Sequence, residues 1–175
     1  MIQMNEHRQE KNSQYFIVDS TAIIHHFIFE RKIDDNEVLI IPEMLKEEII
    51  SFQAKSNLAL LSEERQIIFA TPTESAVSLV TNSAKESGDY SSLSKTDLNV
   101  IALSQDYPNS VVLSDDNAVQ NVCNKLNVKF QSFQFKIKHQ REYFWKCTVC
   151  GSKFKQKVGS CPDCGSPTKR HYKKK

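Results

Sequence analysis

The chain has 175 residues, 39% of them hydrophobic and 25% charged, which is enough for one ordinary domain core or two small ones. A mean hydropathy of −0.46 and short apolar runs exclude a membrane-spanning helix, which needs roughly 20 apolar residues. Three of the four glycines lie after residue 150, so the main body has no glycine-rich phosphate loop or dinucleotide fingerprint. The first ten residues are polar and carry charges of both signs. We therefore expect no secretory signal and a cytoplasmic protein.

The net charge of +2 conceals an asymmetry. Residues 136–175 contain 12 Lys and Arg against 2 acidic residues, a net charge of +10. Residues 1–135 contain 11 basic and 19 acidic residues, a net charge of −8. An acidic body with a basic end is typical of a protein that binds a polyanion at one end and uses carboxylate chemistry at the other.

Apolar β-type runs alternate with helical patterns through most of the chain. Residues 1–14 have no hydrophobic periodicity, and we expect a disordered leader there. Strands are predicted at 15–18, 38–41, 66–70, 111–113 and 128–130. Helices are predicted after a cap at Ser20 or Thr21, at 43–52 following Pro42, at 74–87, after a cap at Ser94, and from Asp116 to about Asn124. This alternation predicts an α/β fold, a parallel sheet flanked by helices on both faces.

Acidic residues stand where such a sheet places its ligands, beyond the carboxyl ends of the strands. Each has an ordinary explanation, such as a helix cap, a helix-dipole partner or a solvated helical face. Together they predict a site for Mg²⁺ or Mn²⁺, because clustered carboxylates repel one another unless a divalent cation neutralises them. The positions are Asp19, Glu47 or Glu48, Asp97, and the pair Asp115 and Asp116.

Four cysteines form two Cys-x-x-Cys-Gly pairs near the C-terminal end: Cys147, Cys150, Cys161 and Cys164. Four thiolates at this spacing predict one tetrahedral, structural Zn²⁺, and metal binding would supply most of the folding energy of so short a segment. Disulfides are the alternative, which we do not expect in a chain without a signal peptide. The boundaries predicted here are a basic linker at 135–146, a zinc ribbon at 147–168 and a basic tail at 169–175, of which we expect Lys173, Lys174 and Lys175 to be disordered.

Cations and aromatic rings surround these cysteines, and together they predict binding of single-stranded RNA. Phe144 and Trp145 have a second interpretation, packing of the ribbon against the body. For His25 and His26 we expect packing or exposure and not catalysis. The predicted RNA-binding cations are Lys146, Lys153, Lys155, Lys157, Lys169 and Arg170.

Several motifs carry a resemblance to known families. The segments IVDSTAII, PEMLKEEI, SKTDLNVIAL and VVLSDDNAVQNV resemble those of PIN-domain nucleases. The run SGDYSSLSKTDLNVIALS, with SDDNAVQNV and the four cysteines, resembles the Nob family over roughly Tyr15 to Arg170. That family comprises the endonucleases that form the mature 3′ end of small-subunit ribosomal RNA in archaea and eukaryotes.

The resemblance implies a PIN-like nuclease domain at 15–134 and an enzyme that cleaves single-stranded precursor rRNA during ribosome biogenesis, leaving a 5′-phosphate and a 3′-hydroxyl. It implies a pre-ribosomal particle as partner, with assembly factors beside it, and no membrane. Ser114 stands where threonine is common in the family. The implied catalytic residues are Asp19, Glu47 (with Glu48 adjacent), Asp97, Asp115 and Asp116, of which Asp19, Asp97 and Asp116 would bind Mg²⁺ or Mn²⁺.

Two alternatives stay open. One is a toxin-type PIN ribonuclease acting on transfer or messenger RNA, although such proteins seldom carry a zinc ribbon. The other is a non-catalytic zinc-ribbon protein that binds RNA in ribosome assembly, against which the presence of all four acidic positions argues.

Overall fold

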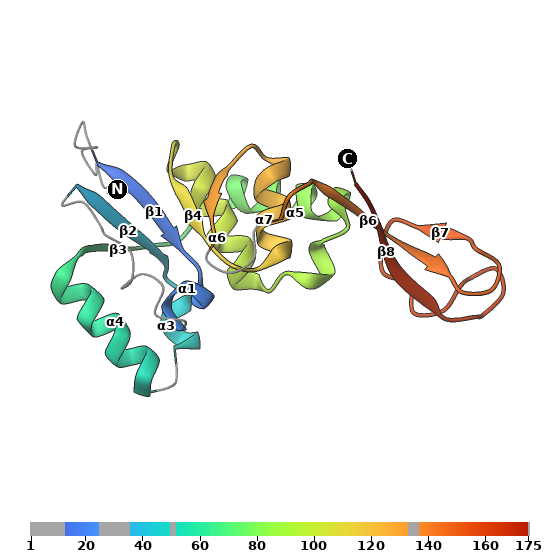
Figure 1. Ribbon diagram of the computed structural model, residues 1–175, viewed down its shortest axis with the longest axis horizontal. Coiled ribbons are helices and arrows are strands. Elements are labelled where there is room, and N and C mark those ends of the chain that lie inside the picture. Colours follow the sequence, from blue (N-terminus) through green and yellow to red (C-terminus); the bar gives the residue numbers. More distant parts are fainter. Residues whose placement is uncertain (1–12, 25–35, 50–51, 133–136, 175) are drawn as a thin grey trace, which may run out of the picture.

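The computed structural model describes residues 13–24, 36–49, 52–132 and 137–174. His25 and His26 therefore lie outside the described residues. An α/β body and a separate three-stranded ribbon follow one another along the long axis of the molecule (Figure 1). The body contains β1 (Gln14–Val18), α1 (Ser20–Ile24), β2 (Glu37–Pro42), α3 (Leu45–Glu48), α4 (Phe52–Glu64), β3 (Gln66–Ala70), α5 (Glu74–Ser87), the 3-10 helix η1 (Tyr90–Ser92), α6 (Lys95–Asp106), β4 (Val111–Leu113), α7 (Asn117–Lys125) and β5 (Lys129–Gln131).

The five strands of the body are parallel and lie in the order β3-β2-β1-β4-β5, which confirms the predicted fold class. The chain first builds outward from β1 to β2 and β3, and then returns to add β4 and β5 on the other side. The strand order therefore reverses between β1 and β4. Ligands of open α/β sheets bind at this switch point.

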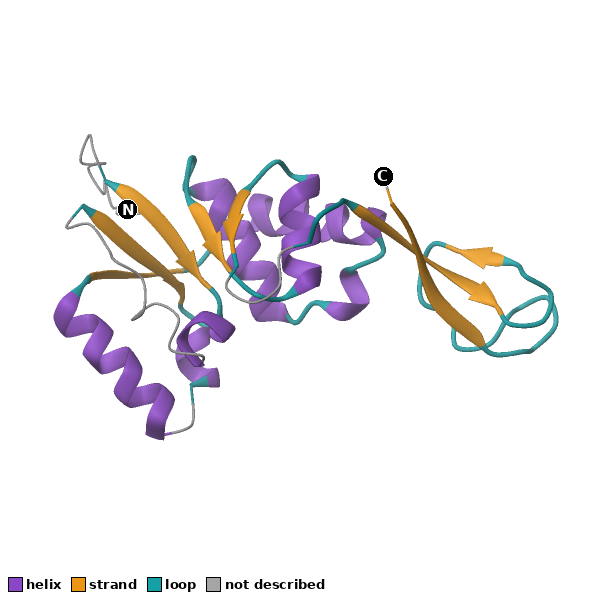
Figure 2. Ribbon diagram, viewed as in Figure 1, coloured by secondary structure: helices purple, strands orange, loops and turns teal. Residues whose placement is uncertain are grey.

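Helices cover both faces of the sheet (Figure 2). Because strand side chains alternate between faces, Phe16 and Val18 pack in one core with residues of α1, α3 and α4, whereas Ile17 packs in the other with residues of α5, α6 and α7. Leu61 and Ile101 are both fully buried, one in each core. The chain is thus a three-layer body whose carboxyl strand ends share one edge.

The region after β2 differs from its prediction. Pro42 is the last residue of β2, paired with Ala70, and does not begin a helix. The predicted helix at 43–52 is reduced to α3, and α4 was not predicted at all. Leu61 of α4 is fully buried but the adjacent Leu60 is 50% exposed, so apolar residues lie on both the buried and the exposed side of this helix. The segment therefore lacks the one-sided apolar periodicity from which a helix is predicted.

The C-terminal boundaries also differ from their predictions. A second sheet has the order β7-β6-β8, built from β6 (Arg141–Cys147), β7 (Lys153–Phe154) and β8 (Thr168–Lys174), all antiparallel. Part of the predicted linker is therefore β6. Residues 169–174 of the predicted basic tail belong to β8, including Lys173 and Lys174, which were expected to be disordered. An edge strand such as β8 tolerates many charged residues, because their side chains face water. No described helix has the length and apolarity needed to cross a bilayer.

Candidate active site and cysteine cluster

Asp19 lies at the switch point, one residue beyond β1. Its side chain is 1% exposed. Val18 pairs with Leu113 across β1 and β4, so the residues that follow them, Asp19 and Ser114, come side by side. The Ser114 hydroxyl donates to Asp19 Oδ2 at 2.6 Å and the Thr21 hydroxyl donates to the same oxygen at 2.9 Å. The Ser20 backbone N–H donates to Oδ1 at 2.6 Å.

Burial raises the pKa of the Asp19 carboxyl above its ordinary value, although the hydrogen bonds from Ser114 and Thr21 act in the opposite direction. The negative charge of Asp97 raises the pKa of Asp19 further. The two acids therefore lie within electrostatic reach of one another. A divalent cation between them would relieve both the burial and the repulsion.

The predicted acids at helix starts also serve as caps. Asp97 Oδ2 accepts from the Ser94 backbone N–H at 2.7 Å, and the Asp97 N–H donates to Ser94 Oγ at 3.1 Å, which completes a capping box on α6. Asp116 Oδ1 accepts from the backbone N–H groups of Ala118 and Val119 at 2.6 and 3.0 Å and caps α7. Capping holds each carboxyl group in a defined orientation at the carboxyl edge of the sheet. Asp115 precedes Asp116 and is half-buried.

Glu47 lies on α3 with its side chain exposed. It lines an open groove of about 840 Å³ between α3 and the start of α6, together with Glu43, Lys95 and Asn99. Asn99 Nδ2 contacts Met44 Sδ across this groove. The groove holds acidic and basic side chains, which suits a polar substrate. The side chain of Glu48 is not described.

The predicted carboxylates are gathered at one edge but do not form a closed cage. Within the described residues, the one group of three or more acidic, His or Cys side chains placed to share an ion is the four cysteines. Asp19 and Asp97 supply the hard oxygen ligands that Mg²⁺ or Mn²⁺ prefers, and Mg²⁺ is commonly held by one or two carboxylates while it keeps several waters. The donor set thus fits a divalent cation.

The ligand atoms of Cys147, Cys150, Cys161 and Cys164 lie within 4.8 Å of one another. Hydrogen bonds from Ser152 lower the pKa of the Cys150 thiol, and hydrogen bonds from Ser166 lower that of Cys164 to about 6. Thiolates, and not thiols, bind zinc, so these hydrogen bonds favour the ligating form. Four sulfurs at this spacing fit one tetrahedral zinc ion with no open position for a substrate.

Comparison with known proteins agrees with this geometry. A family model described as the PIN domain of ribonuclease matches residues 16–106. Endoribonuclease Nob1 of Pyrococcus abyssi is 35% identical over 125 residues, which cover 70% of this chain and 77% of that protein. Endoribonuclease Nob1 of Archaeoglobus fulgidus is 31% identical over 86% of each chain. This chain belongs to the Nob family of PIN-domain endoribonucleases. Ribonuclease VapC1 of Thermoplasma acidophilum is also similar, 30% identical over 91% of this chain and 79% of that protein.

The ribbon of this Nob-family chain has two different faces, because directly paired residues of antiparallel strands point to the same side. Phe144 pairs with His171, their rings stacking at 5.9 Å between centroids, and Lys153 lies 5.5 Å from the Phe144 ring. Lys146 pairs with both Lys169 and Lys153. We call this side the outer face and keep the name for Phe144, Lys146, Lys153, Lys169 and His171; the ion pair of Glu142 with Lys173 continues the same side. Basic and aromatic groups therefore gather on the outer face, and they include three of the six cations predicted to bind RNA.

The opposite, inner face holds Tyr143, Trp145 and Arg170 and is directed at the body. Trp145 is 6% exposed and lies beside Lys85, Gly88 and Tyr90. The second interpretation of Trp145, packing of the ribbon against the body, therefore describes its position. Phe144 lies on the other face.

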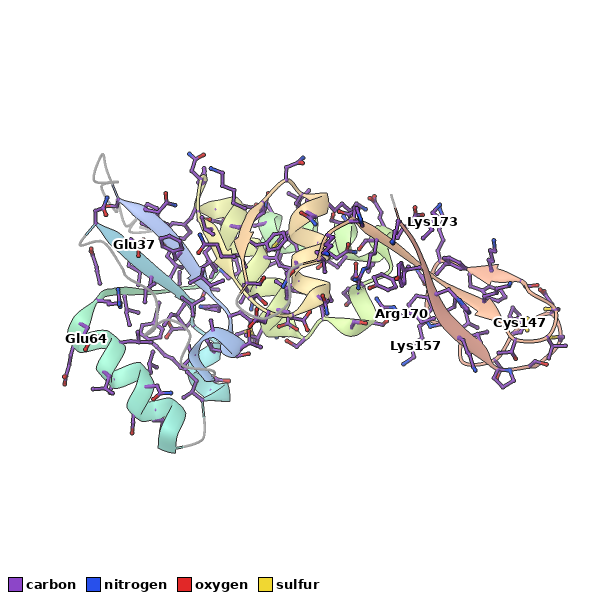
Figure 3. The ribbon with its side chains drawn as sticks, in the orientation of Figure 1. Glu37, Glu64, Cys147, Lys157, Arg170 and Lys173 are labelled. Carbon is purple, nitrogen blue, oxygen red and sulfur yellow. The ribbon has the colours of Figure 1, made fainter. Side chains whose placement is uncertain are left out.

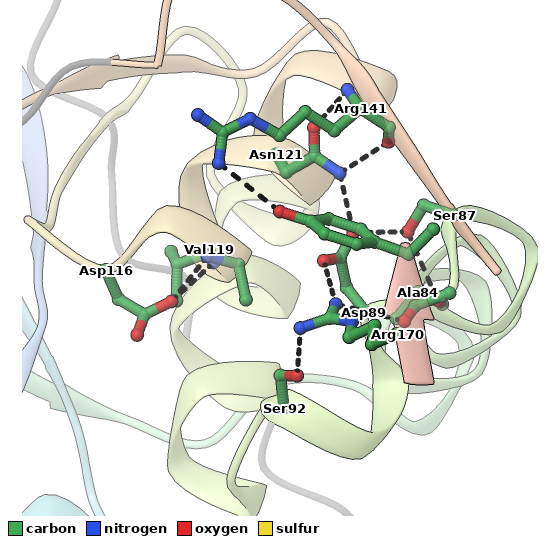
Figure 4. Close-up of polar contacts among 12 residues, drawn as sticks. Ala84, Ser87, Asp89, Ser92, Asp116, Val119, Asn121, Arg141 and Arg170 are labelled. Atoms are coloured by element: carbon green, nitrogen blue, oxygen red, sulfur yellow. Dashed lines mark hydrogen bonds and ion pairs between the residues drawn. The ribbon is translucent and has the colours of Figure 1, made fainter. Parts of the chain in front are cut away.

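Arg170 is held by the body through a buried carboxylate (Figure 4). Its guanidinium pairs with the fully buried Asp89 at 3.0 Å, donates to Ser92 Oγ at 2.7 Å, and stacks 3.7 Å from the centre of the Tyr143 ring. Burial raises the pKa of Asp89, whereas hydrogen bonds from Asn121 and Ser87 and the charge of Arg170 lower it. Arg170 thus couples ribbon and body, a position unlike that of the lysines predicted with it.

The prediction from sequence assigned no role to Asp89 or Asn121. Asn121 of α7 donates to Asp89 Oδ2 at 2.6 Å and exchanges two hydrogen bonds with the backbone of Arg141, at 2.7 and 2.8 Å. Asp89 lies within the run SGDYSSLSKTDLNVIALS that carries the resemblance to the Nob family. The resemblance therefore included Asp89, but its partner, Arg170 of β8, was not recognisable from the sequence.

Proposed function

We propose that this chain is a metal-dependent endoribonuclease that cleaves single-stranded precursor rRNA at the 3′ end of small-subunit rRNA, in the cytoplasm and on a pre-ribosomal particle. The observation that carries the proposal is the buried Asp19 at the switch point of a PIN sheet, with Asp97 in electrostatic reach. The similarity to proteins named Endoribonuclease Nob1 supports the choice of substrate.

The catalytic centre would consist of Asp19 and Asp97, with Asp116 at the next strand end. A bound Mg²⁺ or Mn²⁺ would lower the pKa of an attacking water and stabilise the negative charge on the phosphoryl oxygens. Ser114 and Thr21 hold Oδ2 of Asp19 by hydrogen bonds, so its carboxylate does not have to reorient during the reaction. Asp115 and Glu47 flank this centre as further acidic residues of the same edge.

The outer face of the ribbon would bind the RNA. The carboxylates of the body repel phosphate in the absence of a cation, so affinity must come from elsewhere in the chain. Lys146, Lys153 and Lys169 supply charge for phosphates, and the stacked rings of Phe144 and His171 supply a surface for unpaired bases. The ribbon is then the binding module and the body the catalytic module.

The test is a cleavage assay with Mn²⁺ on a short RNA that spans the 3′ end of the small-subunit rRNA precursor. Asp97→Asn removes one charge from the centre, while an amide oxygen can still accept from the Ser94 N–H. The matched control is Glu64→Gln, an exposed acid at the end of α4, far from the ribbon (Figure 3). We expect cleavage at one position by the wild type and the control, and loss of cleavage in Asp97→Asn or when the divalent ion is withheld. Equal cleavage by Asp97→Asn would refute the proposed centre.

The similarity to Ribonuclease VapC1 supports one competing function, a toxin-type ribonuclease. Transfer RNA in the same assay separates the two: cleavage of transfer RNA in preference to the rRNA precursor would favour the toxin. The remaining alternative is an RNA-binding assembly factor without activity. Binding of the precursor with no cleavage, free or within a pre-ribosomal particle, would favour that reading.

A further inference from the structure

A pocket of about 330 Å³ lies at the junction between the body and the ribbon. The body contributes Lys85, at the end of α5, and Tyr90, in η1. The ribbon contributes Trp145 of β6 and the loop after β7, with Lys155 and Lys157. Lys157 projects from the ribbon between the body and the cysteine end (Figure 3). Lys155 and Lys157, like Arg170, therefore lie away from the outer face and beside residues of the body, which leaves three of the six predicted RNA-binding cations on the outer face.

The pocket carries positive charge. Lys85, Lys155 and Lys157 are all exposed, and none of the described residues that line the pocket is acidic. The nearby carboxylate of Asp89 is already paired with Arg170 at 3.0 Å. Three exposed ammonium groups around one small hollow, with no acidic residue among the described residues that line it, favour an anionic ligand.

The pocket also offers an aromatic surface. Tyr90 is 45% exposed, and Lys85 Nζ lies 5.2 Å from the centre of its ring. Trp145, at 6% exposed, forms part of the wall. An exposed ring beside an ammonium group can contact the base and the phosphate of one nucleotide together. A volume near the lower end of the range for ligand pockets suits one nucleotide and not a duplex.

We propose that this junction pocket binds one nucleotide of a single-stranded RNA, its base against Tyr90 and its phosphate at Lys85, Lys155 and Lys157. The proposal rests on the proposed function for the identity of RNA as ligand. It adds a binding subsite that is lined by residues of both the body and the ribbon. Since Asp89 and Arg170 lock the two halves together, the subsite exists only in the docked arrangement.

The chain contains its own probe, because Trp145 is its only tryptophan. We would titrate the zinc-loaded protein, without Mg²⁺ or Mn²⁺, with a short oligouridylate and record tryptophan fluorescence. We expect a saturable change in emission. In Tyr90→Ala the affinity should fall roughly 5-fold or more, because stacking of one base on an aromatic ring is worth about 1–3 kcal/mol. Tyr90→Phe should bind like the wild type, since it keeps the ring.

Lys85→Ala should reduce the salt dependence of binding by about 0.7 in the slope of log K against log salt, the value for one phosphate contact with a single strand. The matched control is Lys55→Ala, an exposed lysine on α4, which should leave both affinity and slope unchanged. Thermal unfolding of each variant identifies any loss of fold. Wild-type affinity in both Tyr90→Ala and Lys85→Ala would overturn the proposal. A response of Trp145 to an acidic peptide but not to RNA would also overturn it and would indicate a protein-docking site.

Cleavage of the rRNA precursor is measured in parallel with the same variants, so that the two proposals fail separately. If the wild type cleaves the precursor but the Tyr90 and Lys85 variants bind RNA with unchanged affinity, the subsite is refuted and the proposed endoribonuclease activity stands. Binding that depends on Tyr90 and Lys85, with no cleavage of the precursor either free or within a pre-ribosomal particle, would support the subsite and refute the proposed activity.

Discussion

At the scale of single residues, Asp19 shows a conflict between stability and function. Its carboxyl group is 1% exposed, and burial raises its pKa above the ordinary value of 3.8. The folded protein therefore binds a proton at Asp19 more tightly than the unfolded chain does. For an acid of this kind, stability is lost as the pH rises from the ordinary pKa toward the raised one.

We therefore expect Asp19→Asn to unfold at a higher temperature than the wild type at neutral pH without divalent ions, by a few degrees at this chain length. The difference should vanish at low pH, where Asp19 is protonated. Thermal unfolding at both pH values checks the sign. Added Mn²⁺ should raise the melting temperature of the wild type only. A neutral-pH melting temperature below that of the wild type would contradict the account of Asp19.

Arg170 and Lys169 are neighbours in β8 with opposite surroundings. Arg170 pairs with buried Asp89, whereas Lys169 lies on the outer face opposite Lys146. Arg170→Ala should lower the free energy of unfolding by about 2 kcal/mol, less than the usual 3–5 for a buried pair because the Arg170 side chain is 31% exposed. Lys169→Ala should weaken RNA binding and leave stability unchanged. Denaturant unfolding and RNA titration of both variants distinguish the roles. Equal stability in the two would show that the Asp89 contact contributes little.

At the scale of elements, the end of α5 determines how closely β6 approaches the body. Gly88 ends the helix with φ +77°, a conformation that side chains other than glycine rarely adopt. A Cβ at Gly88 would lie 2.5 Å from the carbonyl oxygen of Tyr143 in β6. The absence of a side chain thus permits both the helix end and the contact between body and ribbon.

Gly88→Ala should cost about 2 kcal/mol of stability or more, through backbone strain and displacement of β6. Emission of Trp145 should shift as the ribbon moves away from the body. Gly159→Ala is the matched control, since a Cβ at Gly159 meets no atom within 4 Å. Both variants are compared by thermal unfolding and tryptophan fluorescence. An unchanged Gly88→Ala protein would mean that the docking of β6 is not limited by this contact.

At the scale of the whole molecule, charge and metal chemistry are divided between two modules. The ribbon is too small to bury a core of its own, so we expect its fold to depend on a metal ion that its four cysteines are placed to hold. The body has two hydrophobic cores and does not need that ion. The modules should therefore respond differently to loss of metal.

Replacing Cys147 and Cys150 together by Ser should unfold the ribbon and leave the body folded. Heteronuclear NMR should show loss of dispersed signals for the ribbon strands and retention of those for the body strands. RNA affinity should fall sharply, because the outer face and the junction pocket are lost together. Retained affinity with an unfolded ribbon would contradict the division of labour.

Much of this arrangement was predictable from the sequence because it follows from short-range patterns. Alternating strand and helix signals predicted the parallel sheet, and Asp19 after a buried run predicted an acid at its carboxyl edge. The spacing of the four cysteines predicted a metal-binding ribbon. Each of these depends on residues close together in the chain, whose periodicity or spacing limits the local structure directly.

Only the tertiary structure decided how the two modules meet. Arg170 and Asp89 are 81 residues apart, and nothing in either local segment indicates the partner. The same holds for the division of the lysines between the outer face and the junction pocket, which depends on the register of β6 against β7 and β8. The predicted tail is a strand because β6 pairs with it. Local patterns determined which elements form, whereas burial of Asp89 and pairing with distant strands determined which charges remain available for RNA.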